Sequence, residues 1–179
     1  MRGEPEVDGE AEPSCSLRAD LATLHDDAWH WALNCCRGDR EIAMETLHDS
    51  YLSILDGRAR FAGRSSFKTF AFGVIRWTAI ATRRKAGFRA LLTAPLEAAA
   101  PVSVPATQEA SARMPRVDAA LGRLTNRQRN VVELVLLHDL SVAEAAEVLG
   151  ISRGSASRHY ALAKERLRGA LGATEDGDE

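Results

Sequence analysis

A chain of 179 residues with 45% hydrophobic side chains can build one domain or two small ones, and it has no apolar run of about 18 residues that could span a membrane. Three cysteines, Cys15, Cys35 and Cys36, are too few and too badly spaced for a disulfide framework or a zinc site, so neither a metal nor a cofactor is expected. The acidic N-terminus is unlike a signal peptide, and we expect a cytoplasmic protein.

Charge is distributed unevenly along the chain, which the net value of −2 conceals. Residues 17–89 carry 12 basic against 8 acidic groups, and residues 116–171 carry 9 against 6. The two ends, residues 1–16 and 173–179, are acidic and contain no aromatic side chain. We expect the ends to be disordered tails. The two basic blocks suit a polyanionic partner.

Two helices are predicted at the start of the first basic block. The first spans residues 17–36, where apolar side chains recur on one side. Asp39 can cap a second helix that runs to about Leu55. Its apolar face is made by Ala43, Leu47, Tyr51 and Ile54, and its opposite, acidic face by Glu45, His48, Asp49 and Leu52. Periodicity alone favours a solvated acidic face over a docking surface for a partner.

An aromatic and basic helix is predicted next, from about Phe67 to Arg84, after a loop marked by Gly63. No acid occurs between Asp56 and Glu97. Cations can follow phosphates and exposed rings can stack on unpaired bases, a combination typical of proteins that bind single-stranded nucleic acid. The alternative is that the rings belong to the core, and we expect several of them to be buried and one or two to be exposed.

A flexible linker is predicted over residues 87–115, because this segment is rich in Ala, Ser, Val and Thr and contains four prolines. It separates two small helical domains, at residues 17–86 and 116–172, and the predicted fold class is all-α. In the second domain, Thr125 can cap a helix whose apolar run VVELVLL is expected to form the buried centre.

The strongest signal is the stretch SVAEAAEVLGISRGSASRHYALAKERLRGAL, residues 141–171. Ser141 and Glu144 make a capping box, Gly150 can end the first helix in the left-handed conformation, and Ser152 can cap a second, longer helix. The buried stripe of that helix is predicted to be Ala156, Tyr160, Ala163, Leu167 and Leu171. This layout is typical of a DNA-binding helix-turn-helix, whose second helix enters the major groove. A plain amphipathic helical hairpin is the alternative.

Taken in order, these motifs resemble the extracytoplasmic-function group of alternative sigma factors of bacterial RNA polymerase. Residues 121–168 look like region 4 of that family almost without gaps. The stretch AMETLHDSYL, residues 43–52, is similar to the family's acidic-Gln-acidic helix, with His48 in place of the glutamine. The stretch FAGRSSFKTF, residues 61–70, is similar to the loop that melts the −10 element and captures a flipped base.

The resemblance implies a role for each part of the first domain. The residues expected to dock on the polymerase are Glu45, His48, Asp49 and Leu52. Those expected to hold the opened −10 strand are Phe61, Arg64, Ser65, Lys68 and Phe70, and those expected to neutralise nearby phosphates are Arg76, Arg83 and Arg84. Trp77 stands where the family usually has Asn, and Ala81 where it usually has Asp. These departures bear on the −10 sequence preference more than on melting.

In the second domain the resemblance implies readout of the −35 element. The residues expected to do this are Arg153, Ser155, Ser157, Arg158 and His159. The resemblance places Lys164, Arg166 and Arg168 on phosphates or in solvent. It places Arg127 or Arg129 near the DNA backbone. The implied partners are core RNA polymerase, through its β′ clamp helices and β flap, promoter DNA and an anti-sigma factor. No catalytic motif is found, so no enzyme is expected. The alternative function is a stand-alone helix-turn-helix regulator that acts as a dimer.

Overall fold

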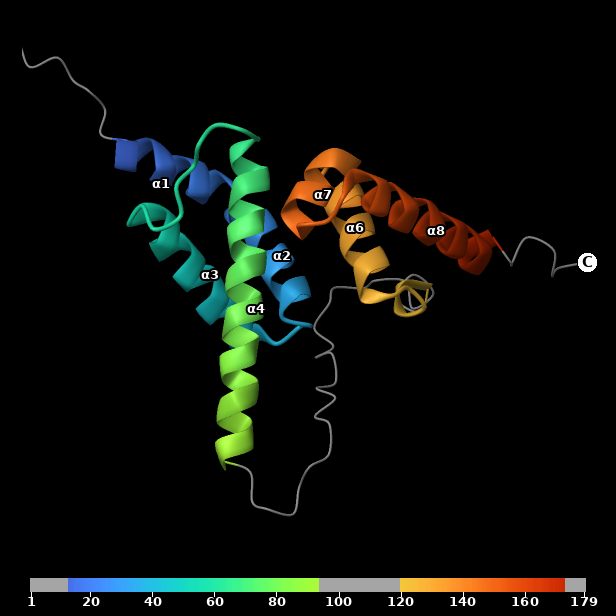
Figure 1. Ribbon diagram of the computed structural model, residues 1–179, viewed down its shortest axis with the longest axis horizontal. Helices are drawn as coiled ribbons and strands as arrows, with labels where there is room; N and C mark the ends of the chain where they lie inside the picture. The colour runs from blue at the N-terminus through green and yellow to red at the C-terminus, as the bar shows by residue number, and fades with distance from the viewer. Residues whose placement is uncertain (1–12, 94–119, 173–179) are drawn as a thin grey trace, which may run out of the picture.

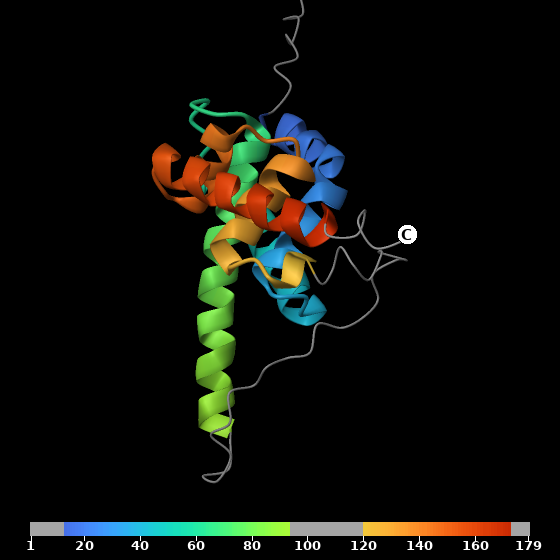
Figure 2. The ribbon, with the colours of Figure 1, turned by 90° about the vertical axis from the view of Figure 1, so that its right-hand side faces the viewer.

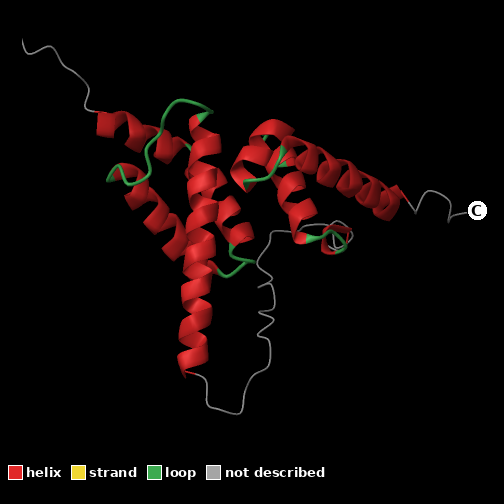
Figure 3. Ribbon diagram, in the orientation of Figure 1, coloured by secondary structure: helices red, strands yellow, loops and turns green. Residues whose placement is uncertain are grey.

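The computed structural model describes residues 13–93 and 120–172, and every regular element in these two ranges is an α-helix (Figure 3). The predicted all-α class is therefore confirmed. The helices are labelled in Figure 1, and their bounds are α1 Pro13–Thr23, α2 His25–Cys35, α3 Arg40–Leu55, α4 Phe67–Thr93, α6 Asn126–Leu136, α7 Val142–Leu149 and α8 Arg153–Gly172. None of them is long and apolar enough to cross a membrane.

The first half of the structure is built around α4, against which α2 and α3 pack (Figure 1). Its centre is a pair of fully buried aromatic side chains, Trp31 and Phe72, whose rings stack with centroids 5.9 Å apart. The indole N–H of Trp31 donates a hydrogen bond to the backbone carbonyl of Phe72 at 3.1 Å, so the buried polar group of the ring is satisfied. These contacts fix α2 on α4.

The ends of two helices differ from the prediction. The single helix expected over residues 17–36 is two helices, because the backbone turns at Leu24 between α1 and α2. Helix α1 also begins at Pro13, a residue that suits the first helical turn, so part of the predicted N-terminal tail is helical. Helix α4 continues past Arg84 to Thr93, since AGFRALLT holds one glycine and no proline. The first seven residues of the predicted linker are therefore helical, and the rest of it lies outside the described residues.

The second half is the predicted helix-turn-helix, with its caps in place. The hydroxyl of Thr125 accepts a hydrogen bond from the Gln128 N–H at 3.3 Å, and that of Ser141 from the Glu144 N–H at 3.2 Å. Both are complete capping boxes. Gly150 ends α7 with φ of 60°, in the left-handed conformation expected from its position.

The apolar faces of the second half are confirmed in part. On α8, Ala156 and Ala163 are fully buried, while Tyr160 and Leu167 are half-buried. The expectation for VVELVLL is wrong at its end: Leu136 and Leu137 are 53% and 61% exposed. The helix stops at Leu136, so the last turn of that run no longer faces the centre.

The two halves share one hydrophobic core. Helix α7 lies side by side with the first part of α4 (Figures 1 and 2). Trp31 and Phe72 of the first half belong to the same buried cluster as Leu134, Leu140 and Leu149 of the second. The sequence predicted two domains but not this packing, because the period of each helix identifies a buried face without naming the helix that covers it.

Candidate functional site

The exposed start of α8 carries the predicted recognition residues. Arg153, Ser157 and Arg158 are exposed, and His159 is half-buried. Ser152 caps the helix as expected, since its hydroxyl accepts a hydrogen bond from the Ser155 N–H at 3.1 Å. The surface therefore offers two guanidinium groups and short polar side chains at a helix N-terminus, the groups that bind phosphates and base edges in the major groove.

Farther along α8, two predicted DNA contacts have partners within the chain. The ammonium group of Lys164 is exposed and lies 5.5 Å from the centre of the Tyr160 ring. Arg166 donates a hydrogen bond to the side-chain carbonyl of Gln128 at 2.8 Å. Arg129 likewise donates to the carbonyl of Leu121 at 2.9 Å. Arg166 thus holds α8 to α6, and Arg129 holds the turn before α6 to that helix. Their charge alone did not predict this role.

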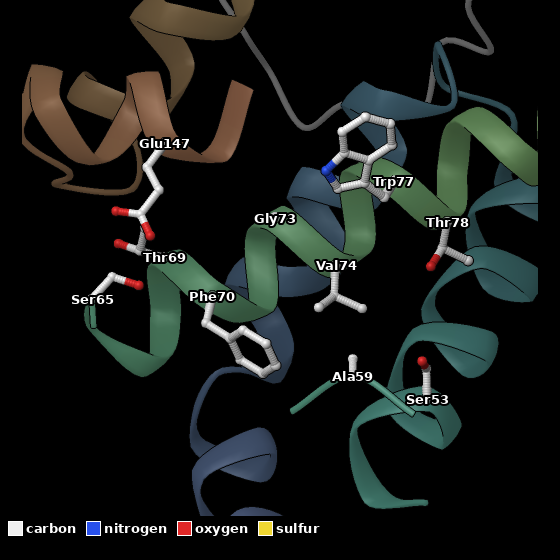
Figure 4. Close-up of a pocket in the computed structure, with 10 residues that line it drawn as sticks. All are labelled: Ser53, Ala59, Ser65, Thr69, Phe70, Gly73, Val74, Trp77, Thr78 and Glu147. Carbon is white, nitrogen blue, oxygen red and sulfur yellow. The ribbon is translucent and has the colours of Figure 1, made fainter. Parts of the chain in front are cut away.

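A pocket of about 450 Å³ lies between α4, the segment that precedes it and the end of α3, and Glu147 of α7 also lines it (Figure 4). Ser65 and Phe70, two of the residues predicted to bind the −10 strand, line this pocket together with Val74 and Trp77. The indole of Trp77 is 67% exposed, the largest exposed fraction among the large apolar side chains of the described residues. The pocket therefore combines an apolar wall, an exposed ring and hydroxyl groups.

Aromatic rings also support the loop before α4. Phe61, 41% exposed, lies edge-on to Phe67 with ring centroids 5.6 Å apart and is 5.3 Å from Phe70. Phe67 and Phe70 are half-buried, whereas Phe72 is fully buried. The expectation of several buried and one or two exposed rings on this helix is met in part: Phe72 is the fully buried ring and Trp77 the exposed one, and the loop before α4 adds the exposed ring of Phe61.

Three of the predicted phosphate-binding cations are engaged within the chain. The Lys68 ammonium forms an ion pair with Asp27 at 2.7 Å. Arg76 donates a hydrogen bond to the Leu149 carbonyl at 3.2 Å. The remaining contact is from the Arg83 guanidinium to the Cys35 carbonyl, also at 3.2 Å. The other two predicted cations, Arg64 and Arg84, are exposed. In this structure the cationic surface of α4 is therefore largely occupied by the protein itself.

An ion cluster lies where the two halves meet. Nδ1 of His138 is 3.5 Å from an oxygen of Asp27, and both rings of the core pair, Trp31 and Phe72, contact its imidazole edge-on. His138 is 3% exposed, and burial lowers its pKa. Partial burial raises the pKa of Asp27, but the hydrogen bond and charge of Lys68 outweigh it and leave that pKa below the usual value. Neutral His138 thus lies beside an ionised Asp27.

The acidic face of α3 is exposed as a single stripe. His48 and Asp49 are exposed, Leu52 is 38% exposed, and Glu45 is 3.9 Å from Lys85 in a loose ion pair. The opposite face is buried, as predicted, through Ala43, Leu47 and Ile54. The four predicted docking residues therefore lie together on one surface.

Sequence reasoning missed two residues at these surfaces. Met44, 63% exposed, adds apolar area to the stripe on α3, and its position four residues before His48 is the signal that could have found it. Trp77, which the sequence singled out only as a departure from the family, shares a face with Phe70 and Val74 at helical spacing. Asp27 gave no signal, because its partners Lys68 and His138 lie far away in the sequence.

Nothing in the described ranges forms a cluster of three or more metal-ligating side chains. Cys35 and Cys36 are free thiols on α2 and the residue after it, and burial raises the pKa of both. A raised pKa disfavours the reactive thiolate, so these groups behave as small core side chains.

Comparisons with known proteins agree with this geometry. Residues 115–167 match the family model described as Sigma-70, region 4. The chain is 31% identical over 137 residues to the ECF RNA polymerase sigma factor SigM of Mycobacterium tuberculosis, and the match covers 76% of this chain and 68% of SigM.

Two solved structures have a similar fold at lower identity. One is the sigma factor RpoE of Bartonella quintana in complex with the anti-sigma factor NepR, with a TM-score of 0.66, 19% identity, and coverage of 89% of this chain and 99% of that one. The other is CnrH in complex with the cytosolic domain of CnrY, with a TM-score of 0.59, 18% identity, and coverage of 92% and 93%. The SigM match, together with the region 4 match of residues 115–167, shows that the chain belongs to the ECF family of RNA polymerase sigma factors.

Proposed function

We propose that this sigma factor divides promoter recognition among three surfaces: the stripe on α3 docks on core RNA polymerase, the pocket on α4 holds the opened −10 strand, and the start of α8 reads the −35 element. The observation that carries this proposal is the match to SigM, which spans both halves of the chain. It favours an initiation factor over a stand-alone dimeric regulator. The polymerase supplies the chemistry, so no catalytic residue is assigned to this chain.

The docking assignment is supported by the composition of the α3 stripe. Glu45 and Asp49 provide negative charge, while Met44 and Leu52 provide exposed apolar area of the kind found at protein interfaces. His48 lies between them on the same stripe. The face suits a partner surface with cationic groups around an apolar patch, for which the β′ clamp helices are the candidate.

The strand-binding assignment is supported by the pocket. An unpaired base can stack on the exposed indole of Trp77, and hydroxyls such as those of Ser65 and Thr69 can bond to its edge. Arg64 and Arg84 are exposed and can attract the backbone phosphates. Because Trp77 offers a ring in place of an amide, we expect readout at this position to depend on stacking.

The −35 assignment is supported by the exposure of Arg153 and Arg158 on the first turns of α8. An arginine in the major groove can bond two acceptors of guanine at once. The solved relatives RpoE and CnrH are bound to NepR and CnrY, so we extend to this chain an inhibitory partner of the same kind. Core polymerase and promoter DNA are cytoplasmic, and CnrH is bound to the cytosolic domain of CnrY, so we place the protein in the cytoplasm.

The test is run-off transcription with purified core polymerase on a promoter library. We expect initiation from a subset of promoters. A chain that binds duplex DNA tightly as a dimer without polymerase, and starts no RNA, is instead a stand-alone regulator.

Docking is tested separately with the double variant His48→Ala, Asp49→Ala. We expect its affinity for core polymerase to fall at least about fivefold, because the loss of two central side chains of an interface removes more than about 1 kcal/mol. Asp20→Ala, which removes an exposed acid on α1, is the control and is expected to bind normally. Unchanged binding by the double variant excludes the α3 stripe as the docking face.

A further inference from the structure

One carboxylate of the second half is bonded to the strand-binding surface of the first. An oxygen of Glu144, on α7, accepts hydrogen bonds from the Ser66 hydroxyl at 3.3 Å and from the Thr69 hydroxyl at 3.2 Å. Its other oxygen accepts from the N–H and the hydroxyl of Ser141, at 3.0 and 2.8 Å. The backbone bond from Ser141, followed by its hydroxyl bond, lowers the pKa of Glu144. An anion therefore lies against α4.

A second carboxylate on α7 lines the same pocket. Glu147 reaches from α7 toward the side of the pocket where Ser65 and Thr69 lie (Figure 4). Two residues farther along α7, the backbone carbonyl of Leu149 accepts a hydrogen bond from the Arg76 guanidinium at 3.2 Å. Two carboxylates and a carbonyl thus bond to or face the donors proposed for the strand, where phosphate and base oxygens are expected.

An apolar contact holds α7 in this position. Ala145 and Leu149 on α7 are buried in the same cluster as Phe72 and Ile75 on α4. Small side chains at the contact let the two helices approach closely. The hydrogen bonds of Glu144 therefore lie at the edge of the packed α4–α7 contact. There they are more stable than an isolated hydrogen bond on the surface would be.

We propose that the chain closes on itself: α7, through Glu144 and Glu147, covers the strand-binding surface of α4, and the two halves must separate before that surface can take unpaired DNA. This inference rests on the strand-binding assignment made above. Closure needs no second protein, because every contact that makes it lies within one chain. An unpaired strand competes directly with the Glu144 carboxylate for Ser66 and Thr69, and with the Leu149 carbonyl for Arg76.

The test uses the full chain and the variants Glu144→Gln and Glu147→Gln, made separately and together. Glutamine also completes a capping box, so Glu144→Gln keeps the start of α7 while it removes the charge. Glu165→Gln, which removes an exposed acid from α8, is the matched control for net charge. Two quantities are measured: the radius of gyration by X-ray scattering, and the affinity for a fluorescein-labelled single-stranded oligonucleotide by anisotropy.

We expect the wild-type chain and the Glu165→Gln control to be compact and to bind the oligonucleotide weakly. Glu144→Gln is expected to enlarge the radius and to raise the affinity about tenfold, because it removes the charge that strengthens the hydrogen bonds from Ser66 and Thr69. Glu147→Gln is also expected to enlarge the radius and raise the affinity, and the double variant is expected to show a larger change in both than either single variant. A wild-type chain that already scatters as two separated halves overturns the proposal, and so does a gain in affinity no larger than that of the control.

The two readouts separate this proposal from the proposed function. A larger radius in the Glu144→Gln variant without oligonucleotide binding supports the closing contact and overturns the assignment of the pocket to the −10 strand. Tight binding by every form, with an unchanged radius, supports the pocket and overturns the closure.

Discussion

His138 lies among charged groups from three elements. Asp27 and His30 on α2, Lys68 on α4 and Glu133 on α6 all act on its imidazole. Burial contributes most and lowers the pKa, and neither ring nitrogen has a hydrogen-bond partner in the described part of the chain. The folded chain thus favours the neutral ring, and the proton is bound more readily in the unfolded chain.

This arrangement makes stability depend on pH below neutrality. The unfolded imidazole titrates at 6.5 and the folded one lower, so the stability it contributes is present above that value and is lost as the pH falls below it. We expect the free energy of unfolding to drop by at most about 1.4 kcal/mol per pH unit as the pH is lowered below about 6.5. Denaturant melts of wild type and His138→Gln measure it. An equal slope in the variant would assign the effect to other groups.

Trp77 is a residue whose role can be separated from folding. Because the indole is 67% exposed, Trp77→Ala is expected to change the free energy of unfolding by no more than about 0.5 kcal/mol. Loss of stacking is expected to cost about 1–3 kcal/mol of strand binding. Permanganate reactivity of −10 thymines in the polymerase complex measures promoter opening, and Trp77→Phe, which keeps a ring, is the control. Normal opening by Trp77→Ala contradicts a stacking role.

At the scale of elements, the caps and the recognition turn were predictable from the sequence. Thr125, Ser141, Ser152 and Gly150 act through residues three or four positions away, so spacing alone identifies them. The break at Leu24 was not predictable, because apolar spacing continues across it. The bonding of Arg166 to Gln128 was not predictable either, since it joins residues on different helices.

The capping box of α6 gives a stability prediction. Thr125→Ala removes the acceptor of the Gln128 N–H and is expected to lower the free energy of unfolding by about 1 kcal/mol, within a range of about 0.5–2. Thr125→Ser keeps the hydroxyl and is expected to retain most of that stability. Thermal melts of the three proteins compare them, and equal melting temperatures would mean that the cap is replaced by solvent.

The recognition helix gives a specificity prediction. Arg158→Lys keeps the positive charge and loses the forked guanidinium, so we expect it to lose base discrimination of about 1–3 kcal/mol while retaining polymerase binding. Arg158→Ala should in addition weaken promoter binding generally. Transcription from single-base variants of the −35 element measures both. Equal losses on every promoter from the lysine variant would mean that Arg158 contacts only phosphates.

At the scale of the whole molecule, the packing of the two halves was beyond the sequence. Helical spacing predicts that Val131 shares a face with Leu134, and that Phe72 shares a face with Ile75. Only the folded chain shows that these two pairs belong to one buried cluster. The same holds for the ion pair of Lys68 with Asp27: Lys68 was predicted to hold the opened −10 strand, and no role was predicted for Asp27. Local patterns therefore predicted which surfaces exist, and the tertiary structure determined which of them are covered.

A double-mutant cycle tests that packing. Phe72 and His138 belong to different halves and have ring centroids 4.9 Å apart. We expect Phe72→Leu and His138→Leu to show a coupling of about 0.5–1.5 kcal/mol in denaturant unfolding. Trp31→Leu with Phe72→Leu, a pair within one half, is the positive control. Coupling in the control pair without coupling across the halves contradicts a shared core.

The length of α4 has a consequence for how far the halves can travel. Its 27 residues form a rod about 40 Å long at 1.5 Å per residue, and Figure 2 shows its C-terminal end projecting well beyond the packed helices. The 26 residues between Thr93 and Ala120 can stretch to at most about 90 Å. Contour length is thus ample for the helix-turn-helix to leave α4 and reach a distant stretch of duplex. The polymerase that carries both halves then determines the distance between the two promoter elements. The covalent connection sets only an upper limit on the separation of the halves.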